Sequence, residues 1–590
     1  MNSSAYSIEI IPSRAQFRPG DKLTFILRFT TDSSLGNEIY SWSVFDENKL
    51  ILQGGGKLEP SYSEMDNIIL EVPMISGESG AYGMFVTVQT SDGRTFHAET
   101  AFDVAEHWRE APRYGFLSDF SPEEAGKLDD VEFLNKHHIN LVQFYDWMYR
   151  HDRLLADTDE FIDPLGRSIS HLVVKEKIEA LSEHGIASIA YAAVYGSLPD
   201  YAKKHPDQIL YQNDGKPHSL SNFFYIMDIS TDSEWTEHII NEFGLAIQAM
   251  GFDGLHLDQY GFPKKAIRQK GGKPEVVTLK ELYPSFINVV NKAMTEKFTN
   301  RVGLIFNNVS NYPTHTTATT AQDVMYIEVW DPVSHFRELK QVIDNARLWS
   351  GKQVVLAAYL PAFHPDRPAH PKQAEIGATL TMAVIFANGG YHLLIGEHEN
   401  VLADPYYPQY GVISDDFKVR LQHYYDFIVM YRNLLYDHEL DDVSMTFSGG
   451  INTEVVFSAE DIIFQPNGDK GTVWTLVKEK SGVMVIHLIN LLGLDNDVWH
   501  KAKTREPQIL RNIEIKLEIW ETIESVYWAS PDGDSIQASS LDFDYIAKGD
   551  SVGLYARFEV PRLDYWTMVV IRLQNGVPAP TFELARYKKP

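Results

Sequence analysis

The 590-residue sequence contains no cysteine, which excludes disulfides, a thiol nucleophile and cysteine-ligated metal. It also lacks any run close to the roughly 18 to 20 apolar residues that a membrane-spanning helix needs. Lysine and arginine number 52 against 81 aspartates and glutamates, giving a formal net charge of −29. This excess of negative charge disfavours nucleic acid and anionic membranes as partners. We therefore expect a neutral or cationic substrate.

Motifs for several common chemistries are missing as well. Neither GxGxxG nor GxxxxGK(S/T) occurs, so the sequence carries no signature of a nucleotide-binding turn. HExxH and EF-hand patterns are absent, and the 21 histidines show no convincing metal-ligand spacing. No GxSxG marks a hydrolase nucleophile elbow. We therefore expect neither a metal ion nor a cofactor.

What remains is the composition of a globular protein, with 44% hydrophobic and 23% charged residues. A chain of this length is expected to form about two to four domains. Residues 1–106 alternate in short strands separated by turns, which predicts an immunoglobulin-like β-sandwich. Residues 442–590 return to the same alternation and predict a second, C-terminal β-sandwich.

Between these modules, residues 107–441 alternate strands with amphipathic helices, which predicts a (β/α)8 barrel, the TIM-barrel fold. The eight strands are expected at 113–117, 140–146, 187–194, 252–258, 302–307, 325–330, 353–358 and 391–395. The alternative is an open doubly wound sheet, which would favour a glycine-rich phosphate turn that the sequence lacks.

Four connections after strands are long, at 147–170, 195–232, 260–278 and 396–415. Loops beyond roughly 12 to 15 residues are usually functional or disordered, and loops after barrel strands gather on the catalytic face. They carry aromatic residues that could wall a sugar-binding cleft: Trp147, Tyr149, Tyr195, Tyr201, Tyr211, Tyr260, Tyr406 and Tyr407.

The stretch GFDGLHLDQYG, residues 251–261, reads as a helix cap followed by one strand. Alternation places Phe252, Gly254, His256 and Asp258 on one face and the two leucines on the other. With the leucines packed against helices, His256 and Asp258 face the barrel interior. Asp258 then lies at the carboxyl end of its strand, where such barrels place their chemistry. The alternative is that Asp258 caps the next element or pairs with a basic neighbour.

A second acidic stretch is MYIEVWD, residues 325–331, in which Tyr326, Glu328 and Trp330 share the interior face. Burial of a carboxyl group against aromatic rings raises its pKa, as a general acid requires near neutral pH. The alternative is a buried glutamate paired with a lysine or arginine. If Asp258 and Glu328 point into one barrel mouth, the pair suggests glycoside hydrolysis, and the sequence alone does not choose between retention and inversion.

Other polar residues follow neighbouring strands. In QFYDWMYRHD, residues 143–152, Asp146 and Trp147 offer substrate contacts, although a salt bridge from Asp146 to Arg150 is equally compatible with the spacing. Asn307 ends the fifth strand and could bond a sugar hydroxyl or stabilise a turn. The eighth strand carries Tyr391.

The segments QFYDWMYRHD, GFDGLHLDQYG, YIEVWD and GGYHLLIGE…DPYYP, in this order, resemble glycoside hydrolase family 66. This family contains endo-dextranases and cycloisomaltooligosaccharide glucanotransferases. The resemblance implies a retaining mechanism on α-1,6-glucan, with Asp258 as the nucleophile and Glu328 as the acid/base. It also implies that Asp146 holds the substrate at the cleavage point. The further residues that we expect to bind substrate are Trp147, Tyr195, His256, Tyr260, Asn307, Trp330 and Tyr391.

We therefore expect a monomeric enzyme that hydrolyses internal linkages of dextran. The chain has no insertion of roughly 100 residues between its barrel strands, where a further carbohydrate-binding module would need domain size. This favours a dextranase over a glucanotransferase, and a non-catalytic glucan-binding protein is the third alternative. Residues 1–14 lack the features of a signal peptide. An extracellular location with the leader removed is expected, and a cytoplasmic location is the alternative.

Overall fold

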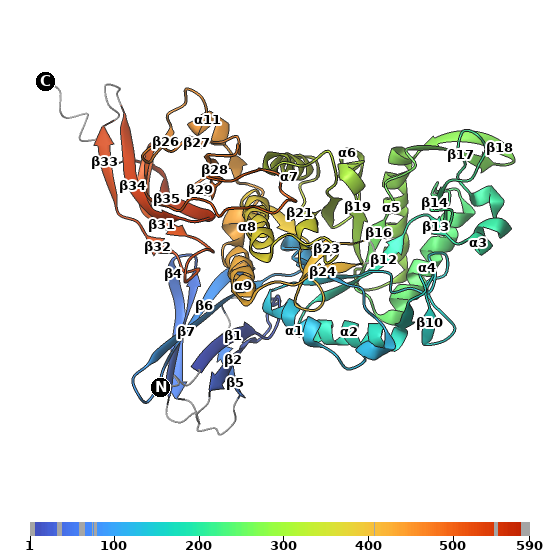
Figure 1. Ribbon diagram of the computed structural model, residues 1–590, viewed down its shortest axis with the longest axis horizontal. Helices are drawn as coiled ribbons and strands as arrows, with labels where there is room; N and C mark the ends of the chain where they lie inside the picture. Colours follow the sequence, from blue (N-terminus) through green and yellow to red (C-terminus); the bar gives the residue numbers. More distant parts are fainter. Residues whose placement is uncertain are drawn as a thin grey trace.

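The computed structural model describes residues 6–31, 38–57, 65–73, 75, 79–405, 408–547 and 553–579. Its centre is an eight-stranded parallel sheet in which consecutive strands are neighbours, in the order β8, β9, β12, β16, β19, β20, β21 and β22 (Figure 1). The bounds are β8 (Tyr114–Leu117), β9 (Leu141–Phe144), β12 (Ala187–Ala193), β16 (Gly254–Asp258), β19 (Gly303–Asn307), β20 (Val324–Glu328), β21 (Val354–Ala357) and β22 (Gly390–His392). This sequential order confirms the TIM barrel, and the doubly wound alternative is wrong.

Helices surround the barrel and bury their apolar faces against it. The longer ones are α1 (Asp129–Lys136), α2 (His171–Glu183), α4 (Glu234–Met250), α5 (Leu279–Lys297), α7 (Phe336–Ser350), α8 (Pro371–Ala387) and α9 (Asp415–Met430). Helix α4 ends at Gly251, whose φ of 88° is the left-handed cap predicted from the sequence. The turn fixes where β16 begins, and so where Asp258 lies at its end.

The two outer strands of the sheet are joined by side-chain bonds. Glu397, which follows β22, accepts hydrogen bonds from the backbone N–H groups of Ser118 and Asp119 and from the Ser118 hydroxyl. Ser118 directly follows β8. These bonds tie the last barrel strand to the first at the carboxyl ends of the strands, beside the expected catalytic face.

The long connections form small sheets of their own. These are the hairpin of β10 (Glu160–Ile162) with β11 (Ser168–Ser170), the sheet of β13 (Gly196–Ser197), β15 (Phe224–Ile226) and β14 (Ser219–Leu220), the hairpin of β17 (Lys265–Lys270) with β18 (Lys273–Thr278), and the hairpin of β23 (Val401–Asp404) with β24 (Gln409–Gly411). Tyr406 and Tyr407 lie outside the described residues.

The N-terminal module packs two antiparallel sheets face to face. One contains β1 (Tyr6–Pro12), β2 (Leu23–Thr31) and β5 (Met65–Val72). The other contains β4 (Lys49–Lys57), β3 (Ile39–Asp46), β6 (Gly80–Gln89) and β7 (Thr95–Val104). The core between them includes an edge-to-face contact of Phe25 with Phe102, with ring centroids 5.1 Å apart.

The C-terminal module also consists of two sheets, antiparallel except for one short parallel strand pair, around a core of their own. The larger one contains β25 (Asp441–Asp442), β28 (Val473–Lys480), β29 (Val483–Asn490), β35 (Trp566–Pro578), β31 (Glu521–Ala529) and β32 (Ser539–Ser540), with β27 (Phe464–Gln465) beside β28. The smaller one contains β26 (Val455–Ser458), β30 (Leu510–Glu518), β34 (Leu554–Leu563) and β33 (Phe543–Ala547). The domain boundaries at residues 106 and 441 stay a prediction.

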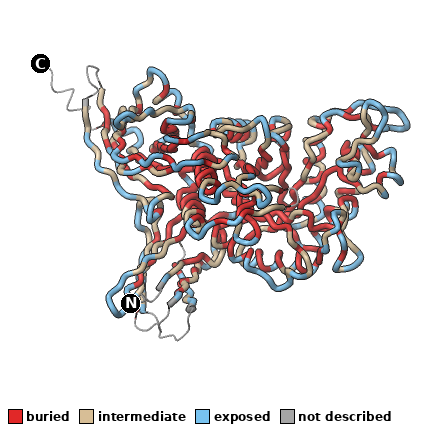
Figure 2. The backbone as a smooth tube through the Cα atoms, in the orientation of Figure 1, coloured by how far each residue is buried: buried red, intermediate tan, exposed pale blue. Residues whose placement is uncertain are grey.

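The two sandwiches touch each other as well as the barrel. Glu47, at the tip of the β3–β4 hairpin, accepts hydrogen bonds from Tyr527 and Arg572 of the C-terminal module. The barrel strands and the adjoining helices form a continuous buried core, drawn red along the middle of the molecule in Figure 2. No helix among the described residues is both long and apolar enough to cross a bilayer.

Candidate active site

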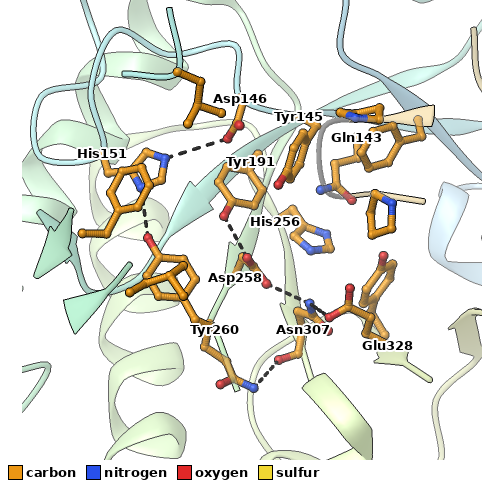
Figure 3. Close-up of a pocket in the computed structure, with 18 of the residues that line it drawn as sticks. Gln143, Tyr145, Asp146, His151, Tyr191, His256, Asp258, Tyr260, Asn307 and Glu328 are labelled. Atoms are coloured by element: carbon orange, nitrogen blue, oxygen red, sulfur yellow. Dashed lines mark hydrogen bonds and ion pairs between the residues drawn. The ribbon is translucent and has the colours of Figure 1, made fainter. Parts of the chain in front are cut away.

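A cavity of about 320 Å³ opens at the carboxyl ends of the barrel strands. Five neighbouring strands or their exits contribute a polar side chain to it, as Figure 3 shows: Gln143, Tyr191, Asp258, Asn307 and Glu328. Because these strands are parallel and in register, side chains at their ends converge on one point of the barrel mouth. The structure therefore brings together the two carboxylates that the sequence singled out.

Asp258 is held by its two neighbouring strands. The Tyr191 hydroxyl of β12 donates to Oδ2 at 2.8 Å, and Nδ2 of Asn307, at the end of β19, donates to Oδ1 at 2.8 Å. Burial raises the pKa of Asp258 to about 6, and the two hydrogen bonds oppose that rise. Within the described chain no lysine or arginine pairs with Asp258, so the expected alternative of a basic partner is wrong.

Glu328 lies opposite on β20 and is 4% exposed. Asn307 Nδ2 lies 3.2 Å from Oε2, the Tyr359 hydroxyl lies 3.3 Å from Oε1, and the Trp330 side chain also bonds this carboxyl group. Burial raises the pKa of Glu328 to about 7, and the negative charge of Asp258 adds to the rise. No cation of the described residues pairs with Glu328, which contradicts the alternative of a salt-bridged glutamate.

Asp146 enters the cavity from the end of β9 with a backbone φ of 49°, in the left-handed region that few non-glycine residues adopt. Its Oδ2 lies 3.3 Å from the Arg167 guanidinium, and its Oδ1 lies 3.8 Å from His151 Nε2. Arg150 instead donates to the backbone carbonyls of Tyr149 and Ile162. The expected salt bridge from Asp146 to Arg150 is therefore wrong, and Arg167 takes that place.

His256 and Tyr260 line the cavity on either side of Asp258 in the sequence. His256 Nδ1 lies 2.8 Å from the Tyr114 hydroxyl, and burial lowers the pKa of His256 to about 3. The imidazole is therefore neutral at the barrel floor. The Tyr260 hydroxyl lies 3.0 Å from Nδ1 of His151, which links it to the Asp146 side of the cavity.

Three residues expected to bind substrate lie in the core instead. Trp147 donates its indole N–H to the Tyr191 carbonyl at 3.2 Å and is fully buried, because the turn after Asp146 directs the next side chain to the helix layer. The Tyr195 hydroxyl donates to the carbonyl of Phe262 at 2.6 Å. Tyr391 stacks on Tyr436 with ring centroids 4.0 Å apart and is 1% exposed.

Comparisons with known proteins identify the family of the chain. The model of Glycosyl hydrolase family 66 matches residues 12–570. The chain belongs to glycosyl hydrolase family 66. Family 66 relatives include a cycloisomaltooligosaccharide glucanotransferase of Niallia circulans, 24% identical over 84% of this chain and 65% of that protein. A dextranase of Streptococcus salivarius is 23% identical over 86% of this chain and 69% of its own.

The chain thus spans about two thirds of the length of these curated relatives. Among solved structures, a cycloisomaltooligosaccharide glucanotransferase of Paenibacillus sp. complexed with cycloisomaltoheptaose aligns with a TM-score of 0.84 at 21% identity. The alignment covers 96% of this chain and all of that one. At this identity the likeness shows a shared fold.

Several cavity residues of this family 66 chain were not predicted from the sequence. Tyr191 carried a weak signal, as the one hydroxyl-bearing aromatic in a predicted apolar strand. Arg167 carried none, because its position depends on how the β10–β11 hairpin folds. It is the only lysine or arginine among the described residues that line the cavity. No group of three histidine, aspartate or glutamate side chains in the described chain is arranged to hold a metal ion.

Proposed function

We propose that the protein is a retaining endo-dextranase that hydrolyses α-1,6-glucosidic linkages and releases isomaltooligosaccharides. The observation that carries the proposal is the pair of carboxyl groups in one barrel-mouth cavity, the half-buried Asp258 and the buried Glu328. Membership of family 66 and the dextranase and glucanotransferase relatives supply the substrate class.

The pKa values of the two carboxyl groups differ in the order that their roles require. Glu328 has the higher pKa, about 7, and Asp258 has the lower, about 6. The pair therefore ionises first at Asp258, which leaves a carboxylate nucleophile beside a protonated acid. Glu328 protonates the glycosidic oxygen while Asp258 attacks the anomeric carbon, and the leaving chain departs with the proton of Glu328.

The second half of the reaction reverses the role of Glu328. Its carboxylate accepts a proton from water, the resulting hydroxide attacks the anomeric carbon, and the bond to Asp258 breaks. Tyr191 and Asn307, which hold the two oxygens of Asp258, orient the nucleophile in both steps. Asp146, fixed by Arg167, accepts hydrogen bonds from hydroxyls of the bound glucosyl unit.

A glucanotransferase is the second candidate, because two relatives from Niallia circulans carry that name. In that reaction a sugar hydroxyl replaces water as the acceptor. Besides their helices, the described connections between the barrel strands contain short hairpins and small sheets and no further module of domain size, which favours hydrolysis. A non-catalytic glucan-binding role does not explain why two carboxyl groups with raised pKa lie side by side in one cavity.

The decisive experiment replaces Asp258 with alanine and measures reducing ends released from dextran. We expect activity to be lost, and undiminished cleavage would refute the assignment. Linear products from the unaltered protein identify hydrolysis, and cyclic products identify transfer. The proposal also places the enzyme outside the cell, because dextran does not enter cells, and activity confined to the cell pellet would contradict this part. It further includes a monomer, which a dimer in size-exclusion chromatography would contradict.

A further inference from the structure

A loop of the C-terminal module lies against the barrel segment that follows the acid/base strand. This loop, residues 491–509, joins β29 to β30. The backbone N–H of Trp499 donates to the carbonyl of Ser334 at 3.0 Å, and that of Phe336 donates to the carbonyl of Asp497 at 3.1 Å. The two chain segments thus pair through their backbones, as neighbouring strands do.

The side chain of Trp499 adds a bond to the same barrel segment. Its indole N–H donates to the carbonyl of Val333 at 2.9 Å, and the residue is only 3% exposed. On its other side, the Trp499 carbonyl accepts the hydroxyl of Thr381 from α8 at 2.9 Å. Trp499 is therefore fixed by the barrel helix and fixes the barrel loop in turn.

The loop is held in shape by one buried ammonium group. Nζ of Lys503 donates to Oδ1 of Asn496 at 3.0 Å and to the carbonyls of Val498 at 2.6 Å and Lys501 at 2.8 Å. Lys503 is fully buried, and its backbone N–H donates to the carbonyl of Gln373 in the first turn of α8. Three acceptors around one ammonium satisfy all its donors, so this one side chain ties together residues 496, 498 and 501 of the loop.

The barrel segment leads directly to the acid/base. The N–H of Val333 donates to the carbonyl of Trp330 at 3.1 Å, which closes a tight turn. The ring of Trp330 contacts that of Tyr359, with centroids 5.6 Å apart, and the Tyr359 hydroxyl lies 3.3 Å from Oε1 of Glu328. The Trp330 side chain also bonds the carboxyl group of Glu328 itself. A displacement of the turn at Val333 therefore moves Trp330, one of the three side chains that hold Glu328.

We propose that Trp499 is a positioning residue for Glu328, so that the C-terminal module completes the acid/base site of the barrel. The proposal rests on the proposed function, because it gives Trp499 an effect on proton transfer by Glu328. That effect is indirect and acts through the position of Trp330. If the contact of Trp499 were purely structural, the outcome would differ. Loss of the bond would then lower stability, and activity would fall equally whatever the leaving group of the substrate.

The test replaces Trp499 with phenylalanine, which keeps an aromatic ring and removes the indole N–H. The matched control is Trp474→Phe, because the Trp474 indole also donates to a carbonyl, that of Pro466, but within the C-terminal module at 3.0 Å. Each variant is assayed on dextran and on 4-nitrophenyl α-isomaltoside, whose leaving group needs little protonation.

We expect Trp499→Phe to lower kcat/KM on dextran by about fivefold, the equivalent of one hydrogen bond. On the nitrophenyl substrate the change should stay within about twofold, because acid assistance matters little there. Trp474→Phe should change the two substrates alike. Equal losses on both substrates for Trp499→Phe would overturn the proposal.

A second variant, Lys503→Gln, keeps the test open if Trp499→Phe does not fold, which circular dichroism would reveal. It weakens the loop while leaving the indole in place, and the same selective loss on dextran is expected. An even loss would count against the proposal. If the unaltered protein and Trp474→Phe do not cleave dextran at all, the proposed function fails instead, and the two failures are therefore distinguishable.

Discussion

Asp258 and Glu328 accept hydrogen bonds from one and the same nitrogen, Nδ2 of Asn307, at 2.8 and 3.2 Å. A neutral donor between two acidic groups stabilises whichever of them is ionised, and it lowers the pKa of both. The sequence suggested that Asn307 bonds a sugar hydroxyl or a turn. In the structure the amide group of Asn307 instead donates to both carboxyl groups and so fixes their positions relative to each other.

We therefore expect Asn307→Ala to shift the pH dependence of kcat/KM toward higher pH. Activity requires ionised Asp258, so it rises through a pKa of about 6, and protonated Glu328, so it falls above about 7. Loss of the shared donor raises both pKa values, by about one unit. Asn308→Ala is the control, because the Asn308 amide bonds backbone carbonyls rather than the carboxyl groups. Limbs that move to lower pH would contradict this role.

The acid role of Glu328 predicts that Glu328→Gln depends on the leaving group. On dextran the glycosidic oxygen must be protonated, and we expect a loss of about 100-fold or more. On 4-nitrophenyl α-isomaltoside the loss in the first step should be much smaller, as measured by the burst of nitrophenol. Equal losses on both substrates would exclude Glu328 as the acid.

The ion pair of Arg167 with Asp146 leads to a prediction about substrate binding. Asp163 fixes Arg167 by accepting its backbone N–H at 2.7 Å and its Nε at 2.8 Å, and the guanidinium then reaches Asp146. We expect Arg167→Gln to lower kcat/KM on dextran by about tenfold or more, because a hydrogen bond to a charged group is lost. Arg150→Gln is the matched control, since Arg150 bonds backbone carbonyls outside the cavity. Similar losses in the two variants would refute the assignment.

The barrel and its two carboxyl groups could be predicted because they follow from local rules. Alternation along β16 and β20 decides which side chains face inward, and parallel strands bring their ends together. Side chains in the loops obey no such period. Trp147 and Arg167 show the difference: the first, next to Asp146, turns into the core, and the second reaches the cavity from a hairpin about twenty residues later.

This difference gives a prediction for Trp147. Because its indole is fully buried beside Phe252, at a centroid distance of 4.7 Å, Trp147→Ala should lower the free energy of unfolding by about 3 to 5 kcal/mol. Tyr260→Ala, at the cavity wall, should raise KM for dextran with a smaller loss of stability. Thermal unfolding and steady-state kinetics separate the two effects. A Trp147→Ala enzyme of normal stability with a raised KM would restore the substrate-binding role.

Asp258 also couples stability to pH. Burial raises its pKa in the folded protein from 3.8 to about 6, so the native state binds more protons than the unfolded state between these values. The free energy of unfolding therefore falls as the pH rises through this window, by up to about 3 kcal/mol for two pKa units. The cost is absent below about pH 4 and complete above the folded pKa of about 6.

Asp258→Asn removes this ionisation, and the loss of its charge also lowers the pKa of Glu328, which acts on stability in the same direction. We expect the variant to gain stability relative to the unaltered protein between pH 4 and pH 8, whatever the fixed effect of the amide on its partners Tyr191 and Asn307. Thermal unfolding of both proteins at the two pH values measures this change. Because any misfit of the amide is the same at both pH values, it cancels in the comparison. A stability difference that does not depend on pH would mean that Asp258 ionises as easily in the cavity as in water, and the raised pKa of the nucleophile would lose its physical basis.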